Sequence, residues 1–570
     1  MFRRARWHNP CTCSKARPLS TRMPYQALKG ASMQNSEYSD AFQYTSGRWL
    51  FNESKRLQER HLEFDIPALL RAAAVSIGRN KADVQSICKL AEGGFNRTFE
   101  ITMNDGFKLI ARLPYPSTQP KRLAVASEVA TMDLVRSSGI PVPEIYGSSI
   151  DANNPVGAEY ILMAKAPGRS LGNVWFTMSE KERIKILSQI AEYEAKLFEI
   201  DFPAYGSIYY DEHLPASMGK KTIRSNGSQK PICVGPDVSL KMWFEERSAL
   251  NFPRGPCKNS EEVLRNVAEK EIAWLQTYGR PRLPFDRVYR DITNYQQSDP
   301  QEHVRNLERY IKIASQLVPT DEWLQRPTLR HPDLNPNNIF ISEDFEIVSI
   351  IDWQHSNILP LFLQAAIPAH FQNYGDPESE ELRQPQLPQD IDDMEEEDRN
   401  KDLELYRRRH LHFYYVGATA KKNNQHFQAL MHDGGLLRRK IFQHAGEPWE
   451  GNNIPLKADL IQVAQDWPAT ITSHAGDNGQ PSPCPISFTV SEIETTMQAV
   501  IKQEEADSQM EILRNAIGIN VDGWISHEGY EQAVLVAAEM KGQAIGYADS
   551  EFEREMTLRH WPFDDHDEKE

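Results

Sequence analysis

The spacing of apolar residues along the chain alternates between a helical and an extended pattern. Apolar residues recur with helical spacing over 37–85 and 119–138, whereas 86–113 holds short apolar runs separated by the turn sequences EGGFN and NDG. A period near 3.6 residues predicts amphipathic helices, and short runs bounded by Gly and Asn predict a strand meander. We therefore expect a helical extension over 37–85, followed by a small β-rich lobe over 86–165.

The remainder of the chain, 166–560, is expected to form a larger, mainly helical lobe, which makes the fold class α+β. Residues 203–260 show little periodicity and are expected to be an irregular insertion. Two apolar runs beside a polar loop predict a hairpin over 328–353. Residues 378–402 carry eleven acidic and three basic residues, which is typical of a solvated, mobile loop. Helices are expected near 179–199, 261–278, 301–318, 403–445, 457–466, 491–516 and 527–556.

Composition and charge argue against several classes of protein and of binding partner. The chain has 570 residues, of which 40% are hydrophobic and 25% charged, as in ordinary globular proteins. No apolar run reaches the roughly 18 residues of a membrane span, and a net charge of −16 argues against nucleic acid as a partner. Six scattered cysteines with no CxxC pair argue against a disulfide framework or a zinc site. Protein partners are not indicated.

The first 36 residues differ from the rest of the chain. They hold seven Lys or Arg residues, several Ser and Thr residues and no acidic residue. The segment lacks the long apolar stretch of a secretory signal, and its composition is typical of a mitochondrial transit peptide. A disordered basic tail is the alternative. The first interpretation places the protein in mitochondria.

The turn sequence EGGFN contains the first candidate for ligand binding. Gly93 and Gly94 lie between two expected strands, where glycine lets backbone N–H groups come close to an anion such as a nucleotide phosphate. A Gly-Gly turn between strands is more often a plain hairpin. This motif therefore carries little weight alone.

A charged pair is expected on the two elements that follow. Arg112 ends an apolar strand, and Glu128 lies three residues after Val125 and four before Met132, on the apolar face of the next helix. An inward carboxylate calls for a cation, so Arg112 and Glu128 are expected to pair. The alternative is that both side chains extend to solvent.

The stretch HPDLNPNNIF, residues 331–340, holds the third candidate. Asp333 is followed five residues later by Asn338, and Asp352 comes fourteen residues beyond, at the end of the strand EIVSIIDW. Amide and carboxylate oxygens are suited to Mg²⁺, which leaves Asp333 free to accept a proton. A lone Asp at a strand end is usually a cap or turn former, but this spacing around two apolar strands favours a site.

These residues carry a resemblance to a known family. The pattern H-x-D-x-x-x-x-N followed by I-I-D-W resembles the catalytic and metal loops of the aminoglycoside phosphotransferase and choline kinase-like families, which are relatives of protein kinases. The resemblance covers roughly 86–356 and implies a two-lobed protein-kinase-like fold. The sequences YTSGRWLFNESKRLQER, CVGP, WFEER and IIDWQH more closely resemble a fungal family called altered inheritance of mitochondria protein 9, described as mitochondrial and phosphotransferase-like.

The resemblance implies a role for each matching residue. Asp333 would be the general base that orients an acceptor hydroxyl, and Asn338 and Asp352 would bind Mg²⁺. His331 would brace the loop rather than take part in the chemistry. The residues that would form the ATP site lie in the glycine turn, the charged pair and the hinge YILMAKAPG: Gly93, Gly94, Arg112, Glu128, Met163, Ala164 and Ala166. Among them, Glu128 would hold Arg112, which would contact the phosphates.

Three features depart from the protein-kinase pattern. Arg112 stands where Lys is usual, DWQ replaces DFG, and EGGFN does not spell G-x-G-x-x-G. No APE-like segment follows Asp352, so the acceptor is expected to be a small molecule with a hydroxyl group. The resemblance thus implies an ATP- and Mg²⁺-dependent small-molecule kinase. The alternative is a non-catalytic kinase-fold protein that binds nucleotide or acts as a scaffold in mitochondrial maintenance.

Overall fold

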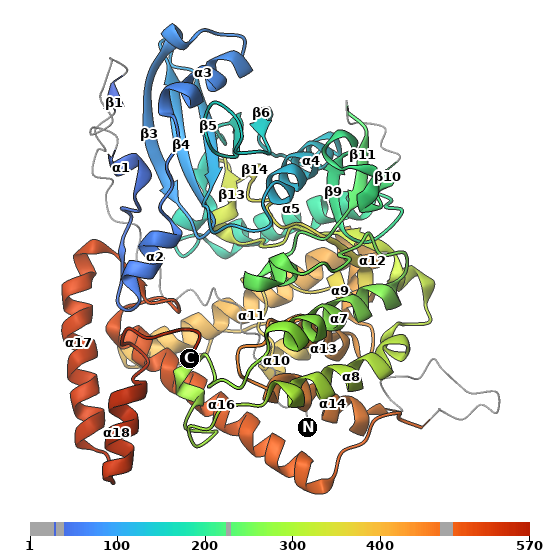
Figure 1. Cartoon of the computed structure of the whole chain (residues 1–570), viewed down its shortest axis with the longest axis vertical. Coiled ribbons are helices and arrows are strands. Elements are labelled where there is room, and N and C mark those ends of the chain that lie inside the picture. Colours follow the sequence, from blue (N-terminus) through green and yellow to red (C-terminus); the bar gives the residue numbers. More distant parts are fainter. Residues whose placement is uncertain (1–27, 30–38, 224–229, 468–482) are drawn as a thin grey trace.

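A six-stranded antiparallel sheet forms the centre of the N-terminal lobe (Figure 1). The computed structural model describes residues 28–29, 39–223, 230–467 and 483–570. Across the sheet the strands are β1 (Leu28–Lys29), β3 (Val84–Glu92), β4 (Asn96–Met103), β5 (Lys108–Pro114), β7 (Tyr160–Ala164) and β6 (Ile145–Ser149).

Two helices pack on opposite faces of this sheet. In β5, Leu109, Ala111 and Leu113 share a core with α3 (Ile66–Ser76). Ile110 points the other way, into a core shared with α4 (Leu123–Ser137). Because side chains alternate along a strand, Arg112 lies on the same face as Ile110, toward α4.

The larger lobe is mainly helical. Its helix α5 (Glu180–Phe198) begins at a capping box formed by Ser179 and Glu182 and packs against α11 (Glu396–Lys422). The other helices of this lobe are α6 (Leu240–Trp243), α7 (Ser260–Tyr278), α8 (Pro300–Leu317), α9 (Leu361–Gln364), α10 (Pro377–Glu380), α12 (Asn424–Leu430), α13 (Gly435–Gly446) and α14 (Ile454–Gln465). The predicted two-lobed α+β fold is confirmed.

The predicted hairpin is present next to the junction of the lobes. Strands β13 (Ile339–Ile341) and β14 (Ile347–Ile350) pair with each other, and β8 (Arg169–Ser170) pairs with β13. Just before the polar loop, β12 (Pro327–Leu329) pairs with β15 (Ile358–Pro360). Both ends of the 330–338 loop are thereby fixed by short sheets.

The N-terminal extension lies against the C-terminal helices. It contains α1 (Ser39–Phe42) and α2 (Glu53–Glu59), and between them β2 (Arg48–Trp49) pairs with β16 (Trp524–Ile525). Figure 1 shows this extension running from the sheet toward the C-terminal helices. These helices are α16 (Val490–Ile517), α17 (His527–Gly546) and α18 (Glu551–His560).

Two expectations about irregular segments differ from the structure. The insertion 203–260 contains a three-stranded sheet of β10 (Lys221–Ile223), β11 (Ile232–Gly235) and β9 (Ser207–Tyr210), and β9 packs against α4. Every residue of β9 and β11 is buried, so the alternation that normally marks a strand is missing. The acidic segment 378–402 ends in helix rather than loop, because α11 begins at Glu396 with three acids in its first turn, where the helix dipole favours them.

Boundaries at the N-terminal end also shift. The extension 37–85 is only partly helical, and β3 begins at Val84 rather than 86. Most of the expected transit peptide, 1–27 and 30–36, lies outside the described residues.

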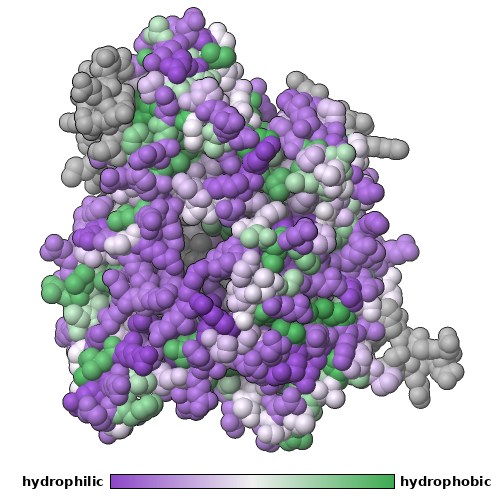
Figure 2. Space-filling view, viewed as in Figure 1, coloured by the Kyte–Doolittle hydropathy of each residue, from purple (hydrophilic) through white to green (hydrophobic). Residues whose placement is uncertain are grey.

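Figure 2 shows a largely hydrophilic face with small apolar patches. None of the helices in the described ranges is long and apolar enough to cross a membrane.

Stability is expected to fall in mild acid because of buried histidines such as His303. His303 lies on α8, is 4% exposed, and has no hydrogen-bond partner among the described residues. Burial lowers its pKa from 6.5 to about 4. Between these values the unfolded chain binds a proton that the folded chain does not, so lowering the pH through this window favours unfolding.

The expected loss at His303 is at most about 3 kcal/mol, from about 1.4 kcal/mol per pKa unit. Denaturant unfolding at pH 7 and pH 4.5 should show a smaller acid loss for His303→Leu than for the unsubstituted protein. Equal losses in the two proteins would contradict the assignment of this proton to His303.

Candidate active site

The predicted pair of Arg112 and Glu128 is formed, and a third charged residue joins it. Arg112 Nη1 bonds the carboxylate of Glu128, which is only 2% exposed. Arg112 Nη2 lies 2.5 Å from Asp352 Oδ1 and donates to Gln354 Oε1 at 3.1 Å. One guanidinium thus links β5, α4 and the loop that follows β14.

The electrostatics of this cluster depend on burial and on the shared guanidinium. Burial raises the pKa of Glu128 above its usual value, which Arg112 opposes and Asp352 reinforces. Burial also works to raise the pKa of Asp352, but the ion pair with Arg112 outweighs it and lowers that pKa. Because a guanidinium keeps its charge in proteins, the contacts of Arg112 with Glu128 and Asp352 are ion pairs.

The loop 331–338 holds the carboxylate of Asp333 at the surface. Asp333 Oδ2 accepts from Asn335 Nδ2 at 2.8 Å, and Asn338 Nδ2 donates to the Asp333 carbonyl at 2.9 Å. Asp333 Oδ1 accepts no hydrogen bond from any residue in the described ranges. The carboxylate is therefore oriented by amides and keeps one oxygen open to an acceptor.

His331 connects this loop to the end of β14. Its Nδ1 accepts from the Asp333 backbone N–H at 3.1 Å, and its Nε2 lies 2.9 Å from the Ile351 carbonyl. A proton on Nε2 satisfies both contacts, and burial lowers the pKa of His331. The ring also packs on Trp353 at 4.6 Å between centroids. A neutral His331 in this position braces the loop, as predicted.

Asn338 and Asp352 emerge at the same end of the β13–β14 hairpin. The Asn338 carbonyl accepts from the Ile351 N–H at 2.9 Å, one residue before Asp352. Asp352 has a φ of 68°, in the left-handed region that non-glycine residues rarely occupy. Asn338 Oδ1 and Asp352 Oδ2 accept no hydrogen bond within the described part of the chain, and the Asp352 side chain is 42% exposed.

These two open oxygens suit a hard cation such as Mg²⁺. No group of three or more His, Cys, Asp or Glu residues that could hold a metal is found among the described residues. Mg²⁺ commonly uses only one or two protein ligands and completes its shell with phosphate and water. The donor set of Asn338 and Asp352 is therefore compatible with this ion.

The glycine turn between β3 and β4 is exposed and uncrowded. A Cβ at Gly94 would meet no atom within 4 Å, and one at Gly93 would meet only the Asn96 carbonyl at 3.7 Å. Neither glycine has a positive φ. The described protein itself therefore does not require glycine at these positions. The next residue, Phe95, packs edge-on against His355 at 5.5 Å.

The hinge residues lie on and after β7. Met163 shares the face of Ile110 and is 7% exposed. The Ala164 N–H is already bonded to the Glu144 carbonyl at 2.8 Å. The Ala166 N–H has no partner in the part of the chain that the structure describes. The pairing of β5 with β7 places Met163 and Ala164 in the same sheet as Arg112, and Ala166 follows two residues after the strand.

Comparison with known families decides the assignment. A family model described as the phosphotransferase enzyme family matches residues 86–398, more than half of the chain. The chain belongs to the phosphotransferase enzyme family. This match confirms the first resemblance seen in the sequence. The second is confirmed because the relatives of this phosphotransferase-family protein include proteins named altered inheritance of mitochondria protein 9.

Two relatives illustrate the extent of similarity. A subtelomeric hrmA-associated cluster protein of Aspergillus fumigatus is 31% identical over 515 residues, which cover 85% of this chain and 97% of that protein. The mitochondrial altered inheritance of mitochondria protein 9 of Kluyveromyces lactis is 23% identical and covers 78% of this chain and 82% of its own. Among solved structures, Plasmodium vivax ethanolamine kinase is 13% identical, with a TM-score of 0.34, over 74% of this chain and 83% of that chain.

Three polar residues of this phosphotransferase-family protein were not anticipated from its sequence. Asn335 orients Asp333, Gln354 contacts Arg112, and Asn96 lies 2.6 Å from Gln354. The role of Asn335 could have been found from the sequence. Asn335 lies two positions after Asp333, a spacing typical of turns in which a side chain bonds a nearby residue. Asn96 and Gln354 are separated by 258 positions, and no local pattern relates them.

A buried network fixes the start of the loop from behind. Arg330 Nε bonds Glu194 on α5 at 3.0 Å, and Arg330 Nη1 donates to the Gln364 and Ala366 carbonyls at 2.6 Å each. Tyr415 on α11 donates to the other oxygen of Glu194 at 2.6 Å. The residue that precedes His331 is therefore held rigidly by the helical lobe.

Proposed function

We propose that this protein is an ATP- and Mg²⁺-dependent kinase that transfers the γ-phosphoryl group to a hydroxyl of a small molecule. The observation that carries the proposal is the linkage of Asp333, Asn338 and Asp352 through His331 and Ile351. Phosphoryl transfer needs positioning and charge neutralisation more than covalent participation by the protein. Family membership supports the reaction class.

Asp333 would orient the acceptor and take its proton. Its carboxylate is held on one oxygen by Asn335 and Asn338 and is open on the other. A hydroxyl that donates to the open oxygen would be aimed in a fixed direction, with its proton accepted as the new bond forms. The rigid loop behind Asp333 limits the positions that this hydroxyl can take.

Asn338 and Asp352 would hold Mg²⁺ through their open oxygens. When bound, the ion would neutralise charge on the nucleotide phosphates. The carboxylates of Glu128 and Asp352 share a single guanidinium, that of Arg112, so the cluster carries one uncompensated negative charge when both are ionised, and a cation would balance it. This excess supports a metal-bound nucleotide over a free one.

The N-terminal lobe would hold the nucleotide. Gly93 and Gly94 would let backbone N–H groups approach the phosphates, which accounts for two uncrowded glycines that the fold does not require. Arg112, positioned by Glu128, would contact the phosphates. The adenine would lie against Met163, donate its amino group to the Ala164 carbonyl and accept from the Ala166 N–H.

A small acceptor is favoured over a protein substrate. In protein kinases, a mobile activation loop follows the metal loop. Here the segment after Asp352 packs into the helical lobe, with Ile358, Leu361 and Phe362 at most 2% exposed. Such a segment offers no extended docking strip for a polypeptide.

The experiment measures nucleotide binding and turnover together. Calorimetric titration with ADP and Mg²⁺ should show binding to both the unsubstituted protein and Asp333→Ala. Only the unsubstituted protein should release ADP from ATP when mitochondrial metabolites are supplied. Binding without turnover on any acceptor would instead support the non-catalytic nucleotide-binding alternative.

We place the protein in mitochondria. The acid-free composition of residues 1–36 and the names of the altered inheritance of mitochondria relatives support this placement. A fluorescent fusion of the full chain should co-localise with a mitochondrial marker, and a fusion that lacks residues 1–36 should not. Mitochondrial signal from the shortened fusion would contradict the transit-peptide assignment.

A further inference from the structure

Three buried charged side chains lie beside the glycine turn. Lys89 and Glu92 are on β3 and Arg97 is on β4, and their side chains are 5%, 0% and 0% exposed. Glu92 pairs with Lys89 at 2.9 Å and with Arg97 at 3.0 Å. Buried charges persist only where partners satisfy them. The remaining partners of this cluster come from outside the sheet.

The N-terminal extension supplies those partners. We call residues 40–62 the strap. Glu92 Oε2 accepts from the Thr45 N–H at 2.8 Å and from Ser46 Oγ at 2.7 Å. Lys89 Nζ and Arg97 donate to strap carbonyls at 2.8–3.0 Å, namely those of Asp40, Gln43, Ala41 and Arg60. The strap therefore completes a cluster whose centre, Glu92, directly precedes Gly93.

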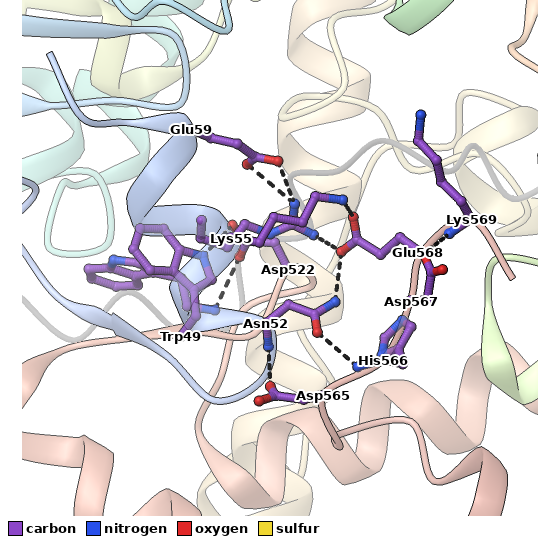
Figure 3. A network of polar contacts seen from close by, with 12 residues as sticks. Trp49, Asn52, Lys55, Glu59, Asp522, Asp565, His566, Asp567, Glu568 and Lys569 are labelled. Atoms are coloured by element: carbon purple, nitrogen blue, oxygen red, sulfur yellow. Dashed lines mark hydrogen bonds and ion pairs between the residues drawn. The ribbon is translucent and has the colours of Figure 1, made fainter.

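The middle of the strap, residues 52–56, is bound to the C-terminal tail, residues 561–570. Figure 3 shows Glu568 beside Lys55 and Asn52. Glu568 pairs with both Lys55 and Arg56, and it accepts from Asn52 Nδ2 at 3.0 Å. The Asn52 side-chain oxygen in turn accepts from the His566 N–H at 2.9 Å. Glu568 of the tail thus holds the two basic residues of helix α2, Lys55 and Arg56.

The tail is itself anchored to the helical lobe. Arg282 donates to the Glu568 carbonyl at 2.6 Å, and Arg290 bonds Glu570 at 3.2 Å. Between its contacts with the cluster and with the tail, the strap packs closely on β16. A Cβ at Gly47 would lie 2.6 Å from the Ile525 carbonyl and from the ring of Trp524. The strap is therefore a second connection between the lobes, separate from the hinge after β7.

We propose that the strap and the tail position the glycine turn for nucleotide binding, with Ser46, Glu92 and Glu568 as positioning residues that do not touch the nucleotide. The inference rests on the proposed function, because it concerns the same nucleotide site. A glycine-rich turn loses conformational freedom when it closes on phosphates, and fixing its flank beforehand reduces that cost. Glu92 can fix this flank, because its side chain bonds the strap and the next residue is Gly93.

The test uses one substitution at each of the two contacts of the strap, with Glu92 and with the tail, in the full-length protein. Ser46→Ala removes an exposed donor to Glu92, and Glu568→Gln removes the charge that pairs with Lys55 and Arg56. Affinity for ADP with Mg²⁺ should fall about 2- to 30-fold in each variant, the usual range for coupling through such networks. The double variant should lose less than the product of the two single losses, because both act through one strap.

Two controls separate positioning from general stability. Ser46→Thr keeps the hydroxyl and should restore the affinity. Glu302→Gln weakens a partly buried pair with Lys457 inside the helical lobe and should lower the unfolding temperature without changing ADP affinity. Hydrogen exchange of residues 92–97 in the free protein should rise in Ser46→Ala and Glu568→Gln, but not in Glu302→Gln.

The outcomes are distinguishable. ADP binding by the unsubstituted protein with equal affinity in Ser46→Ala and Glu568→Gln would overturn this inference and leave the proposed function standing. An unsubstituted protein that binds no ADP would overturn both. Reduced affinity with rescue by Ser46→Thr and faster exchange at the turn would support the inference.

Discussion

Substitution of Asp333 by asparagine is expected to lower phosphoryl transfer by about 10²- to 10⁴-fold, the contribution of a positioned general base. Asparagine has nearly the same shape but cannot accept the hydroxyl proton as a carboxylate does. Asp333 is exposed and lies outside the core, so the unfolding temperature and the affinity for ADP should stay close to those of the unsubstituted protein. ADP release in the presence of acceptor measures the effect.

Asn335→Ala is the matched variant for this result. It keeps the carboxylate of Asp333 but removes the 2.8 Å donor that orients it. A smaller loss, mainly in kcat, is expected because the carboxylate stays and loses its orienting donor, although the substitution also removes the cap that Asn335 Oδ1 gives to the Asn337 N–H. Full activity of Asp333→Asn would refute its assignment as the base, whatever Asn335→Ala does.

Replacing Arg112 by methionine is expected to have the second large effect, on both folding and nucleotide binding. The carboxylate of Glu128, 2% exposed, would lose its cation, and breaking a buried ion pair from one side costs about 3–5 kcal/mol. The same substitution removes the proposed phosphate contact. Thermal unfolding and calorimetric titration with ADP measure the two losses separately.

A double variant separates these two effects of Arg112. Arg112→Met combined with Glu128→Leu removes both charges, so much of the stability should return, while affinity for ADP should stay low. Arg112→Lys should keep the charge and part of the affinity. Wild-type ADP affinity in the stable double variant would show that Arg112 has only a structural role.

The site residues that the sequence predicted are those defined by local patterns. Helical periodicity placed Glu128 on the inner face of its helix, and a buried carboxylate there needs a cation, which Arg112 at the end of the preceding apolar strand supplies. The spacing around the β13–β14 hairpin related Asn338 to Asp352, because a short hairpin returns the chain to its starting end. Each relation spans one or two neighbouring elements, which sequence patterns describe well.

The features of the fold and of the site that the sequence did not predict depend on contacts between segments far apart in the chain. Ser46 and Glu92 are 46 positions apart, and Asn52 and Glu568 are 516 apart. In the sequence, the strap is an amphipathic stretch whose polar residues could equally face solvent. The strands β9 and β11 were missed because tertiary packing buries both of their faces, which removes the alternation that identifies a strand.

Transfer of the γ-phosphoryl group can be followed directly with ATP that carries radioactive phosphorus at the γ position, Mg²⁺ and a small-molecule extract of mitochondria. The proposed mechanism predicts a labelled small molecule with the unsubstituted protein, at least about 100-fold less label with Asp333→Asn, and none when Mg²⁺ is chelated. Absence of any labelled product from a protein that binds ADP, or equal labelling by Asp333→Asn, would contradict it.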